Sequence, residues 1–270
     1  MDPSIRSVVH PTDFSDLSFS AFAHALRIAL ATKSKLHILH VVQMGADRGK
    51  DFPHATRLLA QWGLLEERDL PSADITKLGV DLQNVTLPPQ NPIKGILHFL
   101  NQHRCDLVVL ATRGRDGLDH FLKGSIAETV FNRSAISTLF VPHGARGFVD
   151  EVSGDLLLRQ VLVPIHPSPV PYRAIEAAES FPRLLTGKKT TMHLLHVEGV
   201  FPAFKDAKMP IIFRHGNVVQ TILEAATEYD VDLICMPTAG HHGVFDALRG
   251  STTERVLRHA PCPLLAIPAV

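Results

Sequence analysis

The hydrophobic pattern of the chain alternates between two periods, and it does so twice. Nearly continuous apolar runs predict buried parallel strands, and apolar residues recurring every three or four positions predict helices. In the first half, strands are predicted over 5–10, 36–42, 80–87, 106–111 and 138–141, and helices over 19–30, 58–70, 91–100 and 125–133. In the second half, strands are predicted over 160–164, 191–197, 211–213, 232–237 and 264–267, and helices over 172–185, 218–229 and 251–259. Such alternation indicates α/β architecture, with helices covering parallel sheets.

The two halves are copies of one another. Asn91, Asp106 and Thr112 recur 126 positions later, as do Gly114, Gly117, Gly124, Ser125, Glu128 and Pro142. Upstream the offset is larger, because residues 7–11 resemble 160–164 and residues 36–41 resemble 192–197. We therefore predict two domains, at 1–145 and 158–270, joined by a segment rich in glycine and charge. The second domain is shortened and lacks the second helix, which in the first domain carries the single tryptophan, Trp62.

A glycine-containing loop follows the fourth predicted strand of each half. The first copy reads Ala-Thr-Arg-Gly at 111–114, then nine residues, then Gly-Ser at 124–125. The second reads Pro-Thr-Ala-Gly at 237–240, then nine residues, then Gly-Ser at 250–251. Each precedes a helical pattern that opens with Ser-x-x-Glu, a capping-box sequence. Because free N–H groups at a helix N-terminus favour an anion, each loop has an architecture that can hold a phosphate.

Composition and charge narrow the function classes. Lys plus Arg and Asp plus Glu both number 27, so nothing in the balance points to nucleic acid or an acidic membrane surface. The sequence shows no signal peptide and no apolar run long enough to span a bilayer, so we expect a cytoplasmic protein. Three cysteines without metal-like spacing indicate reduced thiols. The sixteen histidines include no chelating pair on a helix, so no dedicated metal site is expected.

These motifs resemble those of the universal stress protein family in its tandem two-domain form, over nearly the whole chain. The resemblance is carried by Val-His-Pro-Thr-Asp-Phe-Ser at 9–15, His-Ile-Leu-His-Val at 37–41, both loops, and His-Ala-Pro-Cys-Pro-Leu at 259–264. It implies two open parallel five-stranded sheets of order 3-2-1-4-5, a Rossmann-like fold. In that order a ligand is expected in the crevice outside the carboxyl ends of strands 1 and 4.

The resemblance implies an adenine nucleotide site in the first domain. Nucleotide-binding members carry Gly-x2-Gly-x9-Gly-[Ser/Thr], and here alanine replaces the first glycine. ATP, or ADP or AMP, is expected with Mg²⁺, which commonly binds through phosphates. The expected site residues are Pro11, Thr12, Asp13, Val41, Ala111, Arg113, Gly114, Gly124, Ser125 and Ile126. The alternative interpretation is that Asp13 and Ser15 only cap the first helix and that the glycines only form turns.

The second copy departs further from the pattern. A histidine takes the place of Asp13, and a proline, which has no N–H, takes the place of the first glycine. We expect a fold-preserving copy that retains at most a phosphate-sized remnant at His166, Val197, Gly240, Gly250 and Ser251.

Three functions stay open at this stage. No P-loop occurs and no residue stands out as one that orients water for hydrolysis, which favours an ATP-binding regulatory protein of the stress response with little or no turnover. The alternatives are a nucleotide-free interaction scaffold and a slow ATPase. Family members dimerise through the final strand, so residues 139–141 and 265–267 are expected to pair internally, and the whole chain can also form a homodimer. The stress signal and the protein partner are not readable from the sequence.

Overall fold

The computed structural model of the chain describes residues 4–42, 52, 54–66, 74–112, 126–199, 210–238 and 252–268. The N-terminal half contains, in order, β1 (Ser7–Pro11), η1 (Asp16–Ser18), α1 (Phe19–Thr32), β2 (Lys35–Val41), α2 (Ala55–Gln61), η3 (Ile75–Leu78), β3 (Asp81–Leu87), α3 (Pro92–Gln102), β4 (Leu107–Thr112), α4 (Ile126–Ser134) and β5 (Thr138–Pro142). The C-terminal half contains β6 (Gln160–Pro164), α5 (Tyr172–Thr186), β7 (Thr191–Val197), β8 (Ile211–Arg214), α6 (Val218–Glu228), β9 (Leu233–Thr238), α7 (Thr252–Leu257) and β10 (Leu264–Pro268).

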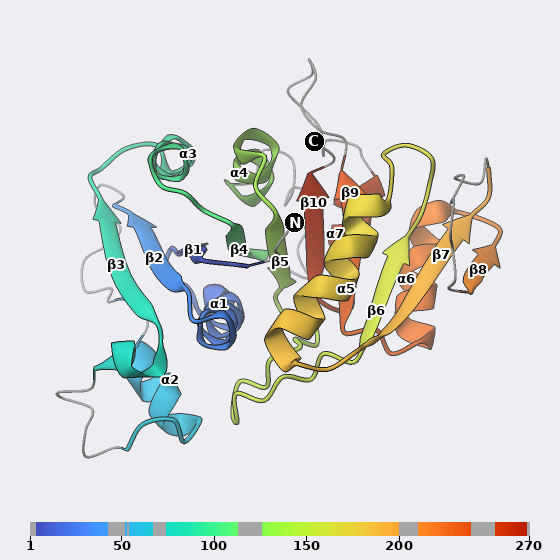
Figure 1. The fold of residues 1–270 in the computed structure, drawn as a ribbon. Coiled ribbons are helices and arrows are strands. Elements are labelled where there is room, and N and C mark those ends of the chain that lie inside the picture. Colours follow the sequence, from blue (N-terminus) through green and yellow to red (C-terminus); the bar gives the residue numbers. More distant parts are fainter. Residues whose placement is uncertain are drawn as a thin grey trace.

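The ten strands form one sheet, in the order β3-β2-β1-β4-β5-β10-β9-β6-β7-β8 (Figure 1). Within each half the pairings are parallel and the order is 3-2-1-4-5, as expected. The halves meet where β5 and β10 pair antiparallel, with Leu139 opposite Leu265. The expected internal pairing of the final strands is therefore confirmed, and neither of these apolar strands is left as an open edge.

Helices cover both faces of the sheet, and a cluster of buried apolar residues lies between the sheet and the helices on each face. One cluster joins α1, α2 and α5 to strand residues such as Val8 and Leu265. The other joins α3, α4, α6 and α7 to residues such as Val9 and Leu264. Neighbouring strand residues enter different clusters because successive side chains of a strand point to opposite faces. The near-continuous apolar strands of the sequence are explained by this burial on both sides.

An asparagine caps the third helix of the first half, and the same cap recurs in the second half. Oδ1 of Asn91 accepts a hydrogen bond from the Lys94 amide at 3.2 Å, and Oδ1 of Asn217 accepts one from the Gln220 amide at 3.1 Å. Each asparagine satisfies an N–H group that has no partner within its helix. The repeat thus preserves the beginnings of α3 and α6.

The second helix is shorter than the predicted span of 58–70. It begins three residues earlier and ends at Gln61. Gly63 has a φ of 70°, which is the left-handed conformation that terminates many helices, and the Leu64 amide donates back to the Leu59 carbonyl at 2.9 Å. The apolar period continues beyond this point, so periodicity alone extended the helix past its glycine. Residues 67–70 lie outside the described part of the chain.

The joining segment forms a packed hairpin. We call residues 143–157 the strap. Val149 forms an antiparallel bridge with Leu156, and the Leu157 amide donates to the Phe148 carbonyl at 2.7 Å. Phe148 is fully buried, and its backbone amide donates to Nε2 of His24 at 3.1 Å. Glycine and charge suggested a mere joining segment, but two apolar pairs that flank a turn are the signature of a hairpin.

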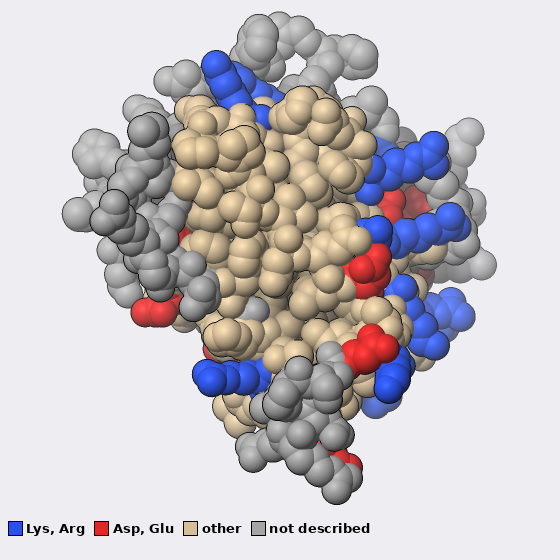
Figure 2. All heavy atoms as spheres, turned by 90° about the vertical axis from the view of Figure 1, so that its left-hand side faces the viewer, with Lys and Arg blue, Asp and Glu red and all other residues tan. Residues whose placement is uncertain are grey.

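The outer edge of the sheet in the N-terminal half is β3. Residues 82–93 contain no charged side chain, and Figure 2 shows a broad surface without charge on this side of the molecule. At the beginning of the strand, Asp81 forms an ion pair with Lys35 at 3.1 Å. Charge on an edge strand discourages pairing with other chains, so this ion pair protects the beginning of β3.

Within the part of the chain that the structure describes, no helix has both the length and the apolar character that a membrane crossing requires.

Candidate functional site

A cavity of about 390 Å³ opens at the carboxyl ends of β1, β2 and β4, beside the beginning of α4. This is the place where the strand order reverses between β1 and β4, which is where ligands bind in open α/β sheets. Every expected site residue that the structure describes lines this cavity: Pro11, Thr12, Asp13, Val41, Ala111 and Ile126. The topology thus brings together residues from three strands and one helix.

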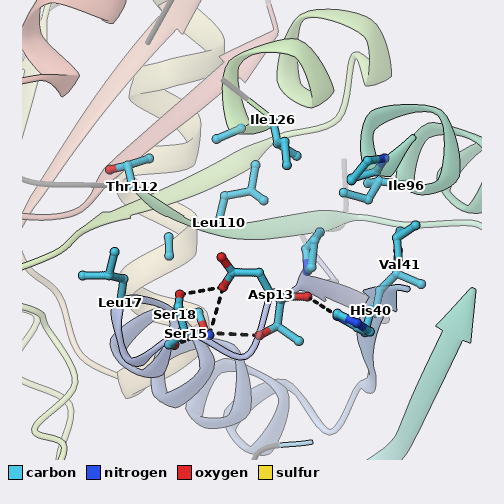
Figure 3. Close-up of a pocket in the computed structure, with 16 residues that line it drawn as sticks. Asp13, Ser15, Leu17, Ser18, His40, Val41, Ile96, Leu110, Thr112 and Ile126 are labelled. Carbon is cyan, nitrogen blue, oxygen red and sulfur yellow. Dashed lines mark hydrogen bonds between the residues drawn. The ribbon is translucent and has the colours of Figure 1, made fainter. Parts of the chain in front are cut away.

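Asp13 lies in the tight turn that follows β1. Its Oδ1 accepts hydrogen bonds from the Ser15 amide at 3.0 Å and from the Ser15 hydroxyl at 2.5 Å. Figure 3 shows the carboxyl group pointing into the space below Leu110 and Ile126. The residue before α1 is Ser18, whose side chain makes no cap hydrogen bond. Asp13 therefore orders the turn that leads into η1, whereas the Ser15 side chain makes no cap hydrogen bond there.

His40 on β2 holds the turn from the other side. Its Nδ1 lies 2.9 Å from the Thr12 carbonyl, and because a carbonyl only accepts, Nδ1 carries the proton. The ring also stacks on Phe14, with the centroids 4.0 Å apart. Phe14 has a φ of 61°, an uncommon conformation for a bulky residue. These contacts hold the strained turn that presents Asp13 to the cavity.

The sequence analysis missed several residues of the cavity wall. They are Ser15, Leu17, Ser18, Leu39, His40, Pro92, Ile96, Leu110, Thr112 and Ala127. Most of them are apolar. The cavity therefore offers apolar contact that suits a flat ring better than a phosphate group. The signal that could have found Leu39, His40, Leu110 and Thr112 is their place at the ends of β2 and β4.

Ala111 and Gly95 show how closely the wall is packed. Ala111 lies within β4 and has no positive φ, so alanine is accommodated without strain where the family pattern has glycine. A Cβ atom at Gly95 on α3 would lie 3.1 Å from Cγ2 of Val41, which is tighter than an ordinary contact. The glycine therefore lets α3 approach the end of β2, where Val41 forms part of the cavity.

The phosphate-binding part of the expected site falls largely outside the described residues. Arg113, Gly114, Gly124 and Ser125 belong to this part, and their roles stay predictions. Ile126, which is 40% exposed, begins the nine-residue helix α4 at the cavity. A helix N-terminus carries partial positive charge, so this end of the cavity favours an anion.

His10 is buried beneath the site. Its Nδ1 lies 3.0 Å from the Val109 carbonyl and donates a hydrogen bond to it, because a carbonyl only accepts. Burial disfavours the charged ring and lowers the pKa of His10 to about 4. The imidazole is thus neutral at neutral pH and contributes no positive charge that could hold a phosphate.

The C-terminal half keeps the histidine contact beside the turn but not the carboxylate. His166 takes the place of Asp13, and its Nδ1 lies 3.3 Å from the Ser168 amide. His196 repeats the contact of His40, with Nδ1 at 3.2 Å from the Ile165 carbonyl. Val197 is buried at the end of β7, whereas Gly240, Gly250 and Ser251 lie outside the described residues. The contact of the histidine on the second strand is therefore retained without the acidic acceptor, whereas the turn itself differs, because Pro167 takes the place of Phe14 and has no positive φ.

Comparisons with known proteins agree with this architecture. The sequence profile of the universal stress protein family matches residues 4–142 and 202–268. Universal stress protein MJ0531 from Methanocaldococcus jannaschii is 29% identical over 140 residues, which cover 50% of this chain and 81% of that protein. Universal stress protein A homolog 1 from Coxiella burnetii is 40% identical over 52 residues, which cover 19% and 35% of the two chains.

Among solved structures, a universal stress protein from Archaeoglobus fulgidus superposes with a TM-score of 0.67 at 21% identity, over 98% of both chains. This likeness shows that the fold is shared over both halves of the chain. Because the family profile covers most of the sequence and the strand order 3-2-1-4-5 occurs in both halves, the chain belongs to the universal stress protein family.

Proposed function

We propose that this protein is a stress-response regulator that binds an adenine nucleotide in the cavity of its N-terminal half. The observation that carries the proposal is the lining of that cavity, which includes both Asp13 and the first residue of α4, Ile126. A carboxylate accepts hydrogen bonds from ribose hydroxyls or from the adenine amino group. The helix N-terminus lies where the phosphates would follow. ATP is the expected ligand, with ADP or AMP as alternatives and Mg²⁺ bound through the phosphates.

The shape and polarity of the cavity support a nucleoside. Its volume of about 390 Å³ falls within the range of small-molecule sites. Leu39, Ile96 and Leu110 offer apolar surface to a base, and Val41 ends β2, where its backbone can meet the base edge. The C-terminal half has a histidine in place of Asp13 and is proposed to bind a nucleotide weakly or not at all.

Isothermal titration of ATP with Mg²⁺ tests this proposal. The unmodified chain is expected to bind one ATP, and Asp13→Ala to weaken binding by about 10- to 100-fold, as for the loss of hydrogen bonds to a charged group. His166→Ala is the matched control, because it occupies the equivalent turn, and it should leave the affinity unchanged. The Asp13 assignment is wrong if Asp13→Ala binds as tightly as the unmodified chain, or if the unmodified chain binds none.

Hydrolysis of ATP is measured in a separate experiment. We propose little or no hydrolysis, since the buried His10 is neutral and the sequence has no P-loop lysine to reach between the phosphates. Phosphate release from ATP should match the rate without protein. Sustained release that Gly114→Val abolishes would instead establish a slow ATPase.

A further inference from the structure

The strap fills a groove between the two halves, and its contacts define what that groove binds. The Arg146 side chain forms an ion pair with Oδ1 of Asp232 at 2.7 Å, and its amide donates to the Pro261 carbonyl at 3.2 Å. Further along, the Phe148 amide donates to His24, and Nε of Arg27 donates to the Gly154 carbonyl at 2.7 Å. Within the strap itself, the Leu157 amide donates to the Phe148 carbonyl at 2.7 Å.

Arg146 also pairs with Asp230, its Nη1 lying 2.6 Å from Oδ1, and in the other half Arg104 takes the place of Asp230. The internal repeat places equivalents of five further contact positions on the other side of the seam. The offset of 126 relates Asp232 to Asp106 and Pro261 to Ala135. The offset of 153 relates His24, Arg27 and Leu157 to Ala177, Ser180 and Ser4. All five equivalents, Ser4, Asp106, Ala135, Ala177 and Ser180, line one cavity of about 420 Å³. The chain therefore builds the strap groove twice and fills one copy with its own strap.

The hydrogen bonds around the two aspartates confirm that the grooves are equivalent. Oδ2 of Asp232 accepts from the amides of Arg159 and Gln160 at 2.7 and 2.8 Å. Oδ2 of Asp106 accepts from the amides of Arg6 and Ser7 at 2.8 and 3.0 Å. In the filled groove Oδ1 of Asp232 binds Arg146, whereas Oδ1 of Asp106 accepts no hydrogen bond from the residues that the structure describes.

We propose that the open groove is a docking site for an extended peptide segment of another protein. The segment carries a basic residue and, two positions later, a bulky apolar residue, as Arg146 and Phe148 do in the strap. The basic side chain binds Oδ1 of Asp106, in a groove whose lining also carries the exposed Glu176 and the exposed Arg173, which donates to the Pro268 carbonyl. The apolar side chain packs beside Ala177, which leaves more space than its equivalent His24. Backbone pairing with Ser4 repeats the pairing of Leu157 with Phe148 and adds a strand to the segment before β1.

The probe for this groove is a fluorescent peptide with the sequence of residues 144–157, titrated into the full-length chain with anisotropy as the readout. We expect saturable binding of one peptide per chain. Asp106→Asn should weaken it by about tenfold or more, because a charge-assisted hydrogen bond is lost. A peptide with alanine in place of its arginine should lose the same factor, and combining the two changes should cost little more, as expected for two directly interacting groups.

A second pair of variants keeps the test decisive if Asp106→Asn folds poorly. Ser180→Tyr fills the groove and should abolish binding, whereas Glu179→Tyr, on the exposed side of α5 and outside the groove lining, should leave it unchanged. Far-ultraviolet circular dichroism confirms that each variant is folded. The proposal is overturned if millimolar peptide does not bind saturably, or if Ser180→Tyr binds as tightly as Glu179→Tyr. Weakening by Asp232→Asn rather than by Asp106→Asn also overturns it, since the peptide then replaces the strap in its own groove.

Discussion

The two halves of the chain share a framework and differ in the side chains that this framework presents. Equivalent aspartates, Asp106 and Asp232, fasten the beginnings of β1 and β6, and equivalent asparagines cap α3 and α6. At the turn that faces the cavity, however, His166 takes the place of Asp13 in the second half. Below the turn, Val163 takes the place of the buried His10. The shared aspartates and asparagines thus maintain the fold in both halves, whereas the proposed nucleotide site differs between the copies at Asp13 and His166.

The grooves beside the seam show the reverse relation. Their backbone framework and one aspartate are shared, but only one groove is occupied by the strap, because the strap can follow β5 to only one side. The same sequence pattern therefore has a structural role in one half and, by our proposal, a binding role in the other. Changes that affect one member of each equivalent pair test this view.

The largest expected effect is on the filled groove. Phe148→Ala removes a fully buried aromatic side chain that contacts both His24 and Phe181, and should lower the free energy of unfolding by about 3–5 kcal/mol. Chemical denaturation measures this change. Val152→Ala, at the 72% exposed tip of the same hairpin, is the control and should change stability by less than about 0.5 kcal/mol. Similar effects of the two changes would mean that the strap is not an integral part of the core.

Acid should affect the N-terminal half more strongly. Burial lowers the pKa values of His10 and His24 to about 4, whereas Val163 and Ala177 occupy the equivalent positions. Between the unfolded pKa of about 6.5 and the folded value, the unfolded chain takes up protons that the folded chain excludes. Stability should therefore fall as the pH is lowered from about 6.5 to about 4, by up to roughly 3 kcal/mol for each histidine.

His10→Val isolates the share of one histidine by giving the first half the residue of the second. Urea unfolding midpoints at pH 7 and pH 4.5 should differ less in this variant than in the unmodified chain. An unchanged difference between the two midpoints would show that His10 does not contribute to the acid sensitivity.

The cavity wall offers a change of intermediate size. Gly95→Thr introduces the residue that the C-terminal half has at Thr221, and its Cβ would press on Val41 at 3.1 Å. ATP affinity should fall by about tenfold, a factor worth about 1.4 kcal/mol, because Val41 is displaced into the site. The reciprocal change, Thr221→Gly, lies in the other half and should leave the ATP titration unaltered. Full affinity in Gly95→Thr would place the ligand away from the end of β2.

The smallest expected effect distinguishes the two aspartates. Asn in place of either residue weakens the hydrogen bonds that Oδ2 accepts, but only Asp232→Asn also loses the ion pair with the half-exposed Arg146. Asp232→Asn should therefore destabilise the chain by about 1 kcal/mol more than Asp106→Asn. Parallel denaturation curves measure this difference, and equal midpoints would indicate that the Arg146 contact makes no net contribution.

Much of the fold was predictable from local patterns. Strand positions followed from apolar runs, and the caps at Asn91 and Asn217 followed from a short side chain next to the first turn. The predicted end of the second helix was wrong, because a period of apolar residues does not report the left-handed conformation at Gly63. At the site, the motif indicated Asp13 and Val41, but apolar wall residues such as Leu110 resembled ordinary core residues and could not be recognised.

The amino-acid sequence determines that this chain alternates strands and helices, that it does so twice, and that only the first copy retains an acidic residue at the ligand-facing turn. These features depend on local periodicity and residue type. The family resemblance predicted that β5 and β10 pair, but the tertiary structure alone decides their register and places the strap in a groove on one side of this seam. Both depend on contacts between residues more than a hundred positions apart, such as Phe148 with His24, which local sequence patterns do not encode.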